Sequence, residues 1–154
     1  MKAESTEIAE QIQIALQAVS PGNGYLTELG ASVHRGFYSH VFADDDTVFP
    51  AAVIHPAVEV PSTVRADIEA VIASEIVLVI GAKLGVGPAG YDQIQACLRD
   101  TRRALIRAMP QITAAAGRDE IELGAAEPDL SKDSSLVLYA MAVQIKFNEQ
   151  YQTG

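Results

Sequence analysis

The sequence predicts an α+β fold in which a mainly antiparallel sheet carries two helices packed on one face. Apolar residues recur at helical spacing in two separate segments, around residues 5–19 and 91–109. Between and after these segments, residues alternate with period two or form β-branched runs. Neighbouring strands joined by short turns favour antiparallel pairing, and the two helices then cover one face in a two-layer arrangement.

A single domain accounts for all 154 residues, because 49 % of them are hydrophobic and no repeat or linker interrupts the chain. We expect only residues 148–154 to form a polar tail, extended or frayed. No apolar run reaches the roughly 18–20 residues that a membrane span needs. The acidic N-terminus is also unlike a secretory signal, so we expect no membrane partner.

The first expected helix begins at Ser5 or Thr6, either of which can cap it. Its apolar face consists of Ile8, Ile12, Ala15, Leu16 and Val19. Residues 20–24 read SPGNG and should end it, because proline and glycine interrupt helices.

Three strands are expected next. Residues 26–38 alternate with period two, as in a half-buried strand. Residues 48–60 contain Pro50 and Pro56, which predict an irregular or edge strand with a bulge near Pro56. Residues 65–83 are ambiguous, because residues 68–76 also have helical spacing. Residues 66–83 should form mainly one long strand, because residues 76–80 are all apolar and four of the five are β-branched.

The second helix is expected over residues 91–109 and should end at Pro110. Its apolar stripe is Ile94, Cys97, Leu98, Thr101, Leu105 and Ala108. A short strand follows at 120–125. The clearest strand spans 134–147, where six alternate positions are Val137, Tyr139, Met141, Val143, Ile145 and Phe147.

The loop at 85–90 matches G-x-G-x-x-G through Gly85, Gly87 and Gly90, which gives nucleotide binding as an alternative function. Two departures count against it: the first glycine does not directly follow the strand, and no acid lies roughly 20 residues later. A plain connecting loop is the better interpretation.

No catalytic or metal-binding constellation stands out. His34, His40 and His55 lack metal-ligand spacing. The run of three aspartates at 44–46 lacks the glycine and glutamate of a calcium loop. Cys97 lies on an apolar helix stripe, which is typical of a buried, inert thiol. We therefore expect no enzyme, no cofactor and no metal.

Four of the 11 basic residues cluster within nine positions, as Arg99, Arg102, Arg103 and Arg107. Asp100 is expected to pair with Arg103. The cluster fits either a solvated helix face or a contact with an acidic neighbour, such as a second copy of this acidic chain. The net charge of −9 disfavours a free-standing DNA-binding protein.

Residues 23–36 read NGYLTELGASVHRG and follow the first helix, and residues 49–54 read FPAAVI. Residues 76–83, the LRDTRRAL segment at 98–105 and the final alternating strand complete a pattern that spans residues 8–151. This pattern resembles the tail terminator (minor tail or tail-completion) proteins of long-tailed bacteriophages.

The resemblance implies a structural virion protein, assembled in the host cytoplasm, that forms a hexameric ring on the tail tube. Such a ring ends tube polymerisation and offers a surface to the head-completion (neck) connector, while DNA passes through the central hole. Another head–tail connector protein is the nearest alternative. No active site is implied. The loops at 41–48, 84–90 and 128–134 would be available to neighbours.

In such a ring, the negative charge of each subunit would act on the DNA that passes through. Six copies would carry 6 × (−9), or −54, and acids on the bore would keep DNA from adhering. Asp44, Asp45 and Asp46 are the candidates for the bore. Arg99, Arg102, Arg103 and Arg107 are the candidates for a subunit or tail-tube contact.

Overall fold

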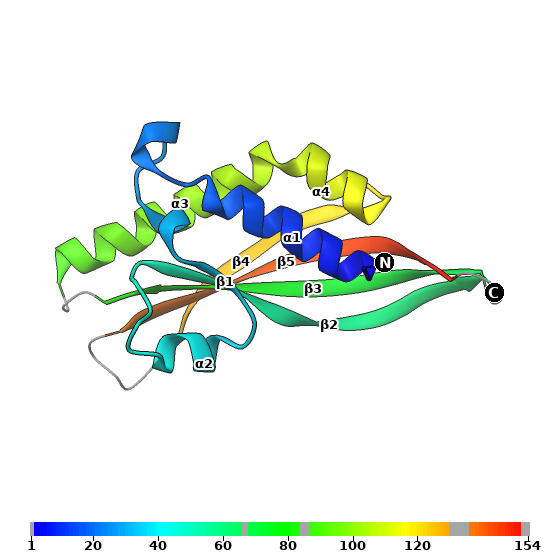
Figure 1. Cartoon of the computed structure of the whole chain (residues 1–154), viewed down its shortest axis with the longest axis horizontal. Coiled ribbons are helices and arrows are strands. Elements are labelled where there is room, and N and C mark those ends of the chain that lie inside the picture. Colours follow the sequence, from blue (N-terminus) through cyan, green and yellow to red (C-terminus); the bar gives the residue numbers. More distant parts are fainter. Residues whose placement is uncertain (1, 66–67, 84–86, 130–135, 152–154) are drawn as a thin grey trace.

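The computed structural model describes residues 2–65, 68–83, 87–129 and 136–151. Its centre is a five-stranded sheet in the order β1-β2-β3-β5-β4 (Figure 1). The strands are β1 (Val33–Arg35), β2 (Ala51–Arg65), β3 (Glu69–Ala82), β4 (Ile121–Asp129) and β5 (Val137–Gln150). Only β1 and β2 pair in parallel, and the other three pairs are antiparallel. The predicted α+β fold with a mainly antiparallel sheet is confirmed.

Three helices, not two, cover one face of the sheet, which we call the helical face. They are α1 (Glu4–Gln17), α3 (Pro88–Arg107) and α4 (Met109–Ala116), and they lie on the same side of the strands in Figure 1. The short helix α2 (Tyr38–Ala43) lies on the other side, where its Phe42 ring reaches within 3.0 Å of where a Cβ on Gly81 would be.

The core lies between the three helices and the sheet. Strand β3 contributes Ile72, Ile76, Leu78 and Ile80, and α1 contributes the apolar face that its spacing predicts. On β5, Met141, Val143, Ile145 and Phe147 are buried, while Val137 and Tyr139 at the start of the strand are partly buried. All six share one face, as the alternation predicts.

The predicted strand over 26–38 is mostly wrong. The chain instead forms a 3-10 turn at Leu29–Ala31, the three-residue strand β1, and then α2 from Tyr38 onward. The reason is tertiary: the backbone N–H groups of Leu26 and Thr27 donate to the Asp100 side chain instead of a neighbouring strand. Local alternation carries no information about such a distant acceptor.

The prediction that Pro110 ends the second helix is also wrong. Helix α3 ends at Arg107, and Pro110 lies in the first turn of α4, where a missing N–H breaks no helical hydrogen bond. Proline plays the same part at the start of α3, since Pro88 is its first residue. The helix therefore begins inside the expected 85–90 loop, of which residues 85–86 lie outside the described residues.

Strands β2 and β3 form a long hairpin whose predicted features are largely confirmed. The register shifts between His55 and Val58, at the bulge expected near Pro56. Strand β1 pairs only with residues 52–54 of β2, so the remainder of β2 is an edge among the described residues.

Three smaller expectations need correction. Strand β4 runs to Asp129 instead of ending at 125, and β5 continues to Gln150 instead of ending at 147, so residues 148–150 take the extended one of the two expected forms and pair with β3. Ala3 is the N-cap of α1, and no side chain caps that helix. The expected cap residues Ser5 and Thr6 lie inside its first turn.

Candidate interaction surfaces

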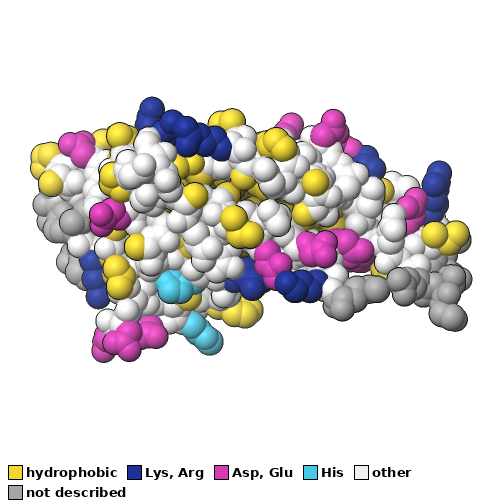
Figure 2. Space-filling view, turned by 45° about the horizontal axis from the view of Figure 1, so that its top comes forward, with side chains coloured by type: hydrophobic (Ala, Val, Ile, Leu, Met, Phe, Trp, Pro, Cys, Tyr) yellow, Lys and Arg dark blue, Asp and Glu magenta, His cyan; other side chains and the backbone are white. Residues whose placement is uncertain are grey.

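The first candidate surface is the arginine surface of α3, formed by Arg99, Arg102, Arg103 and Arg107. The guanidinium carbons of Arg103 and Arg107 lie 5.1 and 5.2 Å from the centre of the Tyr25 ring. Arg103 also donates a hydrogen bond to the carbonyl oxygen of Gly24. Figure 2 shows the resulting band of basic side chains along one edge of the molecule. The loop after α1 therefore holds two of the four arginines in place.

The expected ion pair between Asp100 and Arg103 is wrong. Asp100 is fully buried, and its carboxylate accepts hydrogen bonds from the Leu26 N–H at 3.0 and 3.1 Å. It also accepts from the Thr27 N–H and the Thr27 hydroxyl, both at 2.8 Å. Asp100 lies on the buried side of α3, so its neighbour in space is the loop after α1 and not the arginine surface.

The four arginines form no ion pair among the described residues, whose ion pairs use Lys2, Arg35, Arg65, Arg118 and Lys146. Arg99, Arg102 and Arg107 are exposed. Ile106 is 60 % exposed. It lies on the same side of α3 as Arg102 and Arg103, which stand four and three residues before it. The surface thus combines positive charge with an apolar side chain.

The second candidate surface is the outer face of the sheet, opposite α1, α3 and α4. Its floor includes Val58 and Val60, which are 74 % and 54 % exposed, and Ala73 on the neighbouring strand. They line a groove of about 640 Å³. Helix α2 covers only the end of this face near Gly81, so no described element covers the groove.

Acidic side chains border this groove, which we call the outer-face groove. Among the described residues that line it, Glu75, Asp119, Glu120 and Glu122 stand against one cation, Lys146. Glu75, Asp119 and Glu122 are exposed and form no ion pair among the described residues. The groove therefore joins an apolar floor to an excess of negative charge.

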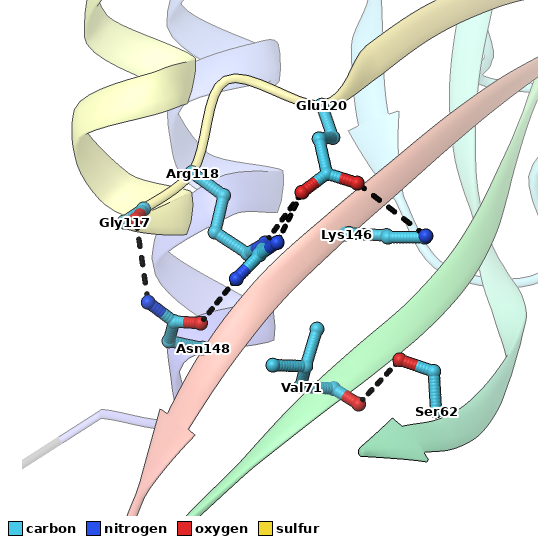
Figure 3. A network of polar contacts seen from close by, with 7 residues as sticks. All are labelled: Ser62, Val71, Gly117, Arg118, Glu120, Lys146 and Asn148. Atoms are coloured by element: carbon cyan, nitrogen blue, oxygen red, sulfur yellow. Dashed lines mark hydrogen bonds and ion pairs between the residues drawn. The ribbon is translucent and has the colours of Figure 1, made fainter.

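A polar network that includes two lining residues of the outer-face groove, Glu120 and Lys146, joins β5 to the segment between α4 and β4 (Figure 3). Glu120 accepts a hydrogen bond from Arg118 Nε at 2.9 Å, and its other oxygen lies 3.4 Å from Lys146 Nζ. The hydrogen bond from Arg118 is the main reason that the pKa of Glu120 is lowered, and Lys146 adds to it. Asn148 joins the network by donating to the Gly117 carbonyl oxygen at 3.3 Å. Glu120 is thus already neutralised, whereas the other three carboxylates are not.

The three histidines considered as metal ligands do not come together at one site. His34 hydrogen-bonds Ser32, whereas His40 and His55 lie beside the Phe37 ring, with ring centres 6.2 and 5.4 Å away. No group of three or more His, Cys, Asp or Glu that could hold a metal occurs in the part of the chain that the structure describes.

Asp44, Asp45 and Asp46 form the expected exposed turn directly after α2. In the glycine motif, Gly85 lies outside the described residues, Gly87 precedes α3 and Gly90 is buried in its first turn. Cys97 is buried as predicted, and this burial raises the pKa of its thiol to about 11.

The outer-face groove was not predicted, although the sequence holds a signal for it. Strand β3 carries apolar residues on both faces, with Val71, Ala73 and Val77 opposite the core. Such a pattern is typical of a strand that is covered on both sides. The described chain covers only one side along most of this strand.

No protein-family model matches the sequence, and no curated protein is significantly similar to it. Among the helices of the described residues, none is long and apolar enough to cross a membrane.

Proposed function

We propose that this protein is a structural virion subunit that forms a ring on the end of a phage tail tube. The ring ends tube polymerisation and offers a surface to the head-completion (neck) connector. One observation supports this best: the chain has two unlike surfaces on opposite sides of the sheet, a basic one on α3 and an acidic, apolar one on the outer face.

Unlike surfaces on opposite sides suit a heterologous contact, in which one patch meets a different patch of the next subunit and repeated copies close into a ring or extend as a filament. A two-fold dimer would instead need one patch that is complementary to itself. Residues 23–36 and 98–105 carry the resemblance to tail terminators, and this resemblance indicates the phage tail as the site where such a ring would act.

The mechanism is steric and interfacial. A ring seated on the last layer of tube subunits occupies the growing end and blocks further addition, and its free side receives the neck. DNA passes through without specific binding, consistent with the net charge of −9. Asp44, Asp45 and Asp46, which are exposed, are the proposed acids of the bore.

The direct test adds the purified protein to growing tail tubes. We expect light scattering and negative-stain images to show rings of about six copies, and tubes to stop lengthening once each end is occupied. Tubes that grow to the same length with and without the protein would contradict the proposal. Binding to the neck connector but not to tubes would instead support the alternative of a head–tail connector.

A further inference from the structure

We infer that the arginine surface of one copy seats in the outer-face groove of a second copy, with Arg99 and Arg102 facing Glu75 and Glu122. This inference rests on the proposed ring and names the contact that closes it. Both surfaces belong to this chain, and among its described residues neither the four arginines nor Glu75 and Glu122 form an ion pair.

The groove offers the chemistry that such a contact needs. Val58 and Val60 expose apolar side chains at its floor, and exposed carboxylates of Glu75, Asp119 and Glu122 stand at its border. A stable protein contact commonly has an apolar centre and a polar rim. The groove has this layout, with a rim in which acidic residues outnumber the cation Lys146.

The arginine surface supplies the complement. Arg99, Arg102 and Ile106 follow at steps of three and four residues, so they form one stripe along α3. Ile106 is 60 % exposed and can contact the valine floor, while the guanidinium groups reach the carboxylates on either side. Arginine is favoured at protein contacts because its planar group pairs with carboxylates through two hydrogen bonds.

A second copy is a better occupant than nucleic acid or an unrelated chain. The groove is acidic and repels nucleic acid, and a basic partner is needed to fill it. The chain carries only 11 basic residues, and four of them lie on α3 without a carboxylate partner among the described residues. Since the two surfaces lie on opposite sides of the sheet, each copy can bind two neighbours at once.

The test reverses the charge on each surface separately. One variant carries Arg99→Glu and Arg102→Glu, and the other carries Glu75→Lys and Glu122→Lys. All four side chains are exposed, and none contacts Tyr25 or Gly24 in the way Arg103 does, so both variants should fold. Circular dichroism and thermal melting check this. Glu7→Lys with Glu28→Lys is the matched control, because it changes two exposed acids that belong to neither surface and form no ion pair among the described residues.

Each variant alone should lose self-association by at least about 100-fold, because like charges then face each other across the contact. The control should assemble as the wild type does. An equal mixture of the two variants should assemble again, because the glutamates of one variant meet the lysines of the other. The chain that carries all four changes should assemble by itself for the same reason.

Three results would overturn the inference. Rings that persist in both variants would show that the contact lies elsewhere, while leaving the proposed tail function intact. Loss of assembly without rescue in the mixture would show that the two surfaces bind different partners. A wild-type chain that stays monomeric, both at millimolar concentration and when added to tail tubes, would overturn the inference and the proposed ring together.

Discussion

Asp100 shows how one residue can be misread when its neighbours in sequence are not its neighbours in space. It stands between arginines in the sequence, yet its buried carboxylate accepts three backbone and side-chain donors from Leu26 and Thr27. A carboxylate that accepts several N–H groups can be buried because each oxygen is satisfied. Asp100 therefore joins the loop after α1 to the middle of α3.

Replacing Asp100 by asparagine should destabilise the protein by about 2–4 kcal/mol, because one amide N–H₂ group would then face the N–H donors of Leu26 and Thr27. Urea unfolding followed by circular dichroism measures the change. Asp92→Asn on the same helix is the control, since Asp92 is exposed and should change stability by less than about 0.5 kcal/mol. Equal midpoints for both variants would argue that Asp100 does not tie the loop to α3.

The residues behind the family resemblance have local structural roles. Gly24 has a φ of 84°, and Tyr25 lies beneath Arg103 and Arg107. Gly30 donates to the Val19 carbonyl oxygen, and a Cβ there would lie 2.5 Å from the Gln17 oxygen. No side chain fits at that distance, so the second glycine of this segment is required by close packing against the end of α1.

Cys97 gives a prediction about pH. Burial raises the pKa of its thiol from an ordinary value of 9.0 to about 11, so the folded chain holds this proton more tightly than the unfolded chain. Its contribution to stability is therefore complete below about pH 9 and is lost as the pH rises toward 11. The difference in unfolding free energy between the wild type and Cys97→Ala should shrink by roughly 2 kcal/mol over that range. A difference independent of pH would contradict this.

At the scale of elements, the two faces of the β2–β3 hairpin differ in burial. On the helical face, Ile72 and Ile76 pack in the core, whereas Val58 and Val60 on the outer face remain exposed. The free edge of β2 is interrupted by Pro56 and Pro61, and both prolines lie at or next to register shifts. Prolines and bulges hinder the addition of a further strand. The hairpin is thus better suited to contact through its face than through its edge.

Lysine substitutions should affect the stability of the protein differently on the two faces of this hairpin. Val60→Lys should change the free energy of unfolding by less than about 0.5 kcal/mol, because the side chain is already 54 % exposed. It should nevertheless weaken self-association if the outer face is an interface. Ile72→Lys should prevent stable folding, because it places an unpaired charge where only 5 % of the residue is exposed. Thermal melting measures the effect on stability, and light scattering measures the effect on self-association. A strongly destabilised Val60→Lys variant would argue against placing Val60 on the exposed outer face.

For the whole molecule, charge is distributed unevenly. The net charge is −9, yet four arginines lie together on α3 while the acidic turn at 44–46 follows α2 on the other side of the sheet. Figure 2 shows one band of basic side chains at the upper edge and one acidic group at the lower left, with side chains of both signs next to each other elsewhere. We propose that this distribution lets the chain contact a second copy of itself locally while the net charge repels polyanions.

We therefore expect duplex DNA to bind the wild-type protein with a Kd weaker than about 10⁻⁴ M at 0.15 M salt. Fluorescence anisotropy of a labelled duplex measures this. A variant with Asp44, Asp45 and Asp46 changed to lysine is the comparison, and it should bind DNA more tightly because it adds three cations in one exposed turn. Micromolar binding by the wild type would contradict a role in which DNA only passes through.

Much of the fold could be predicted where the pattern is local. The core faces of α1, α3 and β5 follow from apolar spacing, and the bulge near Pro56 follows from proline. The candidate site could be predicted only in part. The arginine surface is visible as a cluster in one helix, but the outer-face groove brings Val58 and Glu75 of the β2–β3 hairpin together with Glu122 of β4, which is far away in the sequence.

The sequence by itself determined the α+β class, the antiparallel majority of the sheet, the burial of Cys97 and the concentration of basic residues on one helix. These properties depend on composition and on periods of two or 3.6 residues. Only the tertiary structure decided that Asp100 serves the loop after α1, that residues 26–38 turn instead of extending, and that the arginines and the acidic groove lie on opposite sides. Those outcomes depend on partners brought together by strand order and helix packing, which no local pattern encodes.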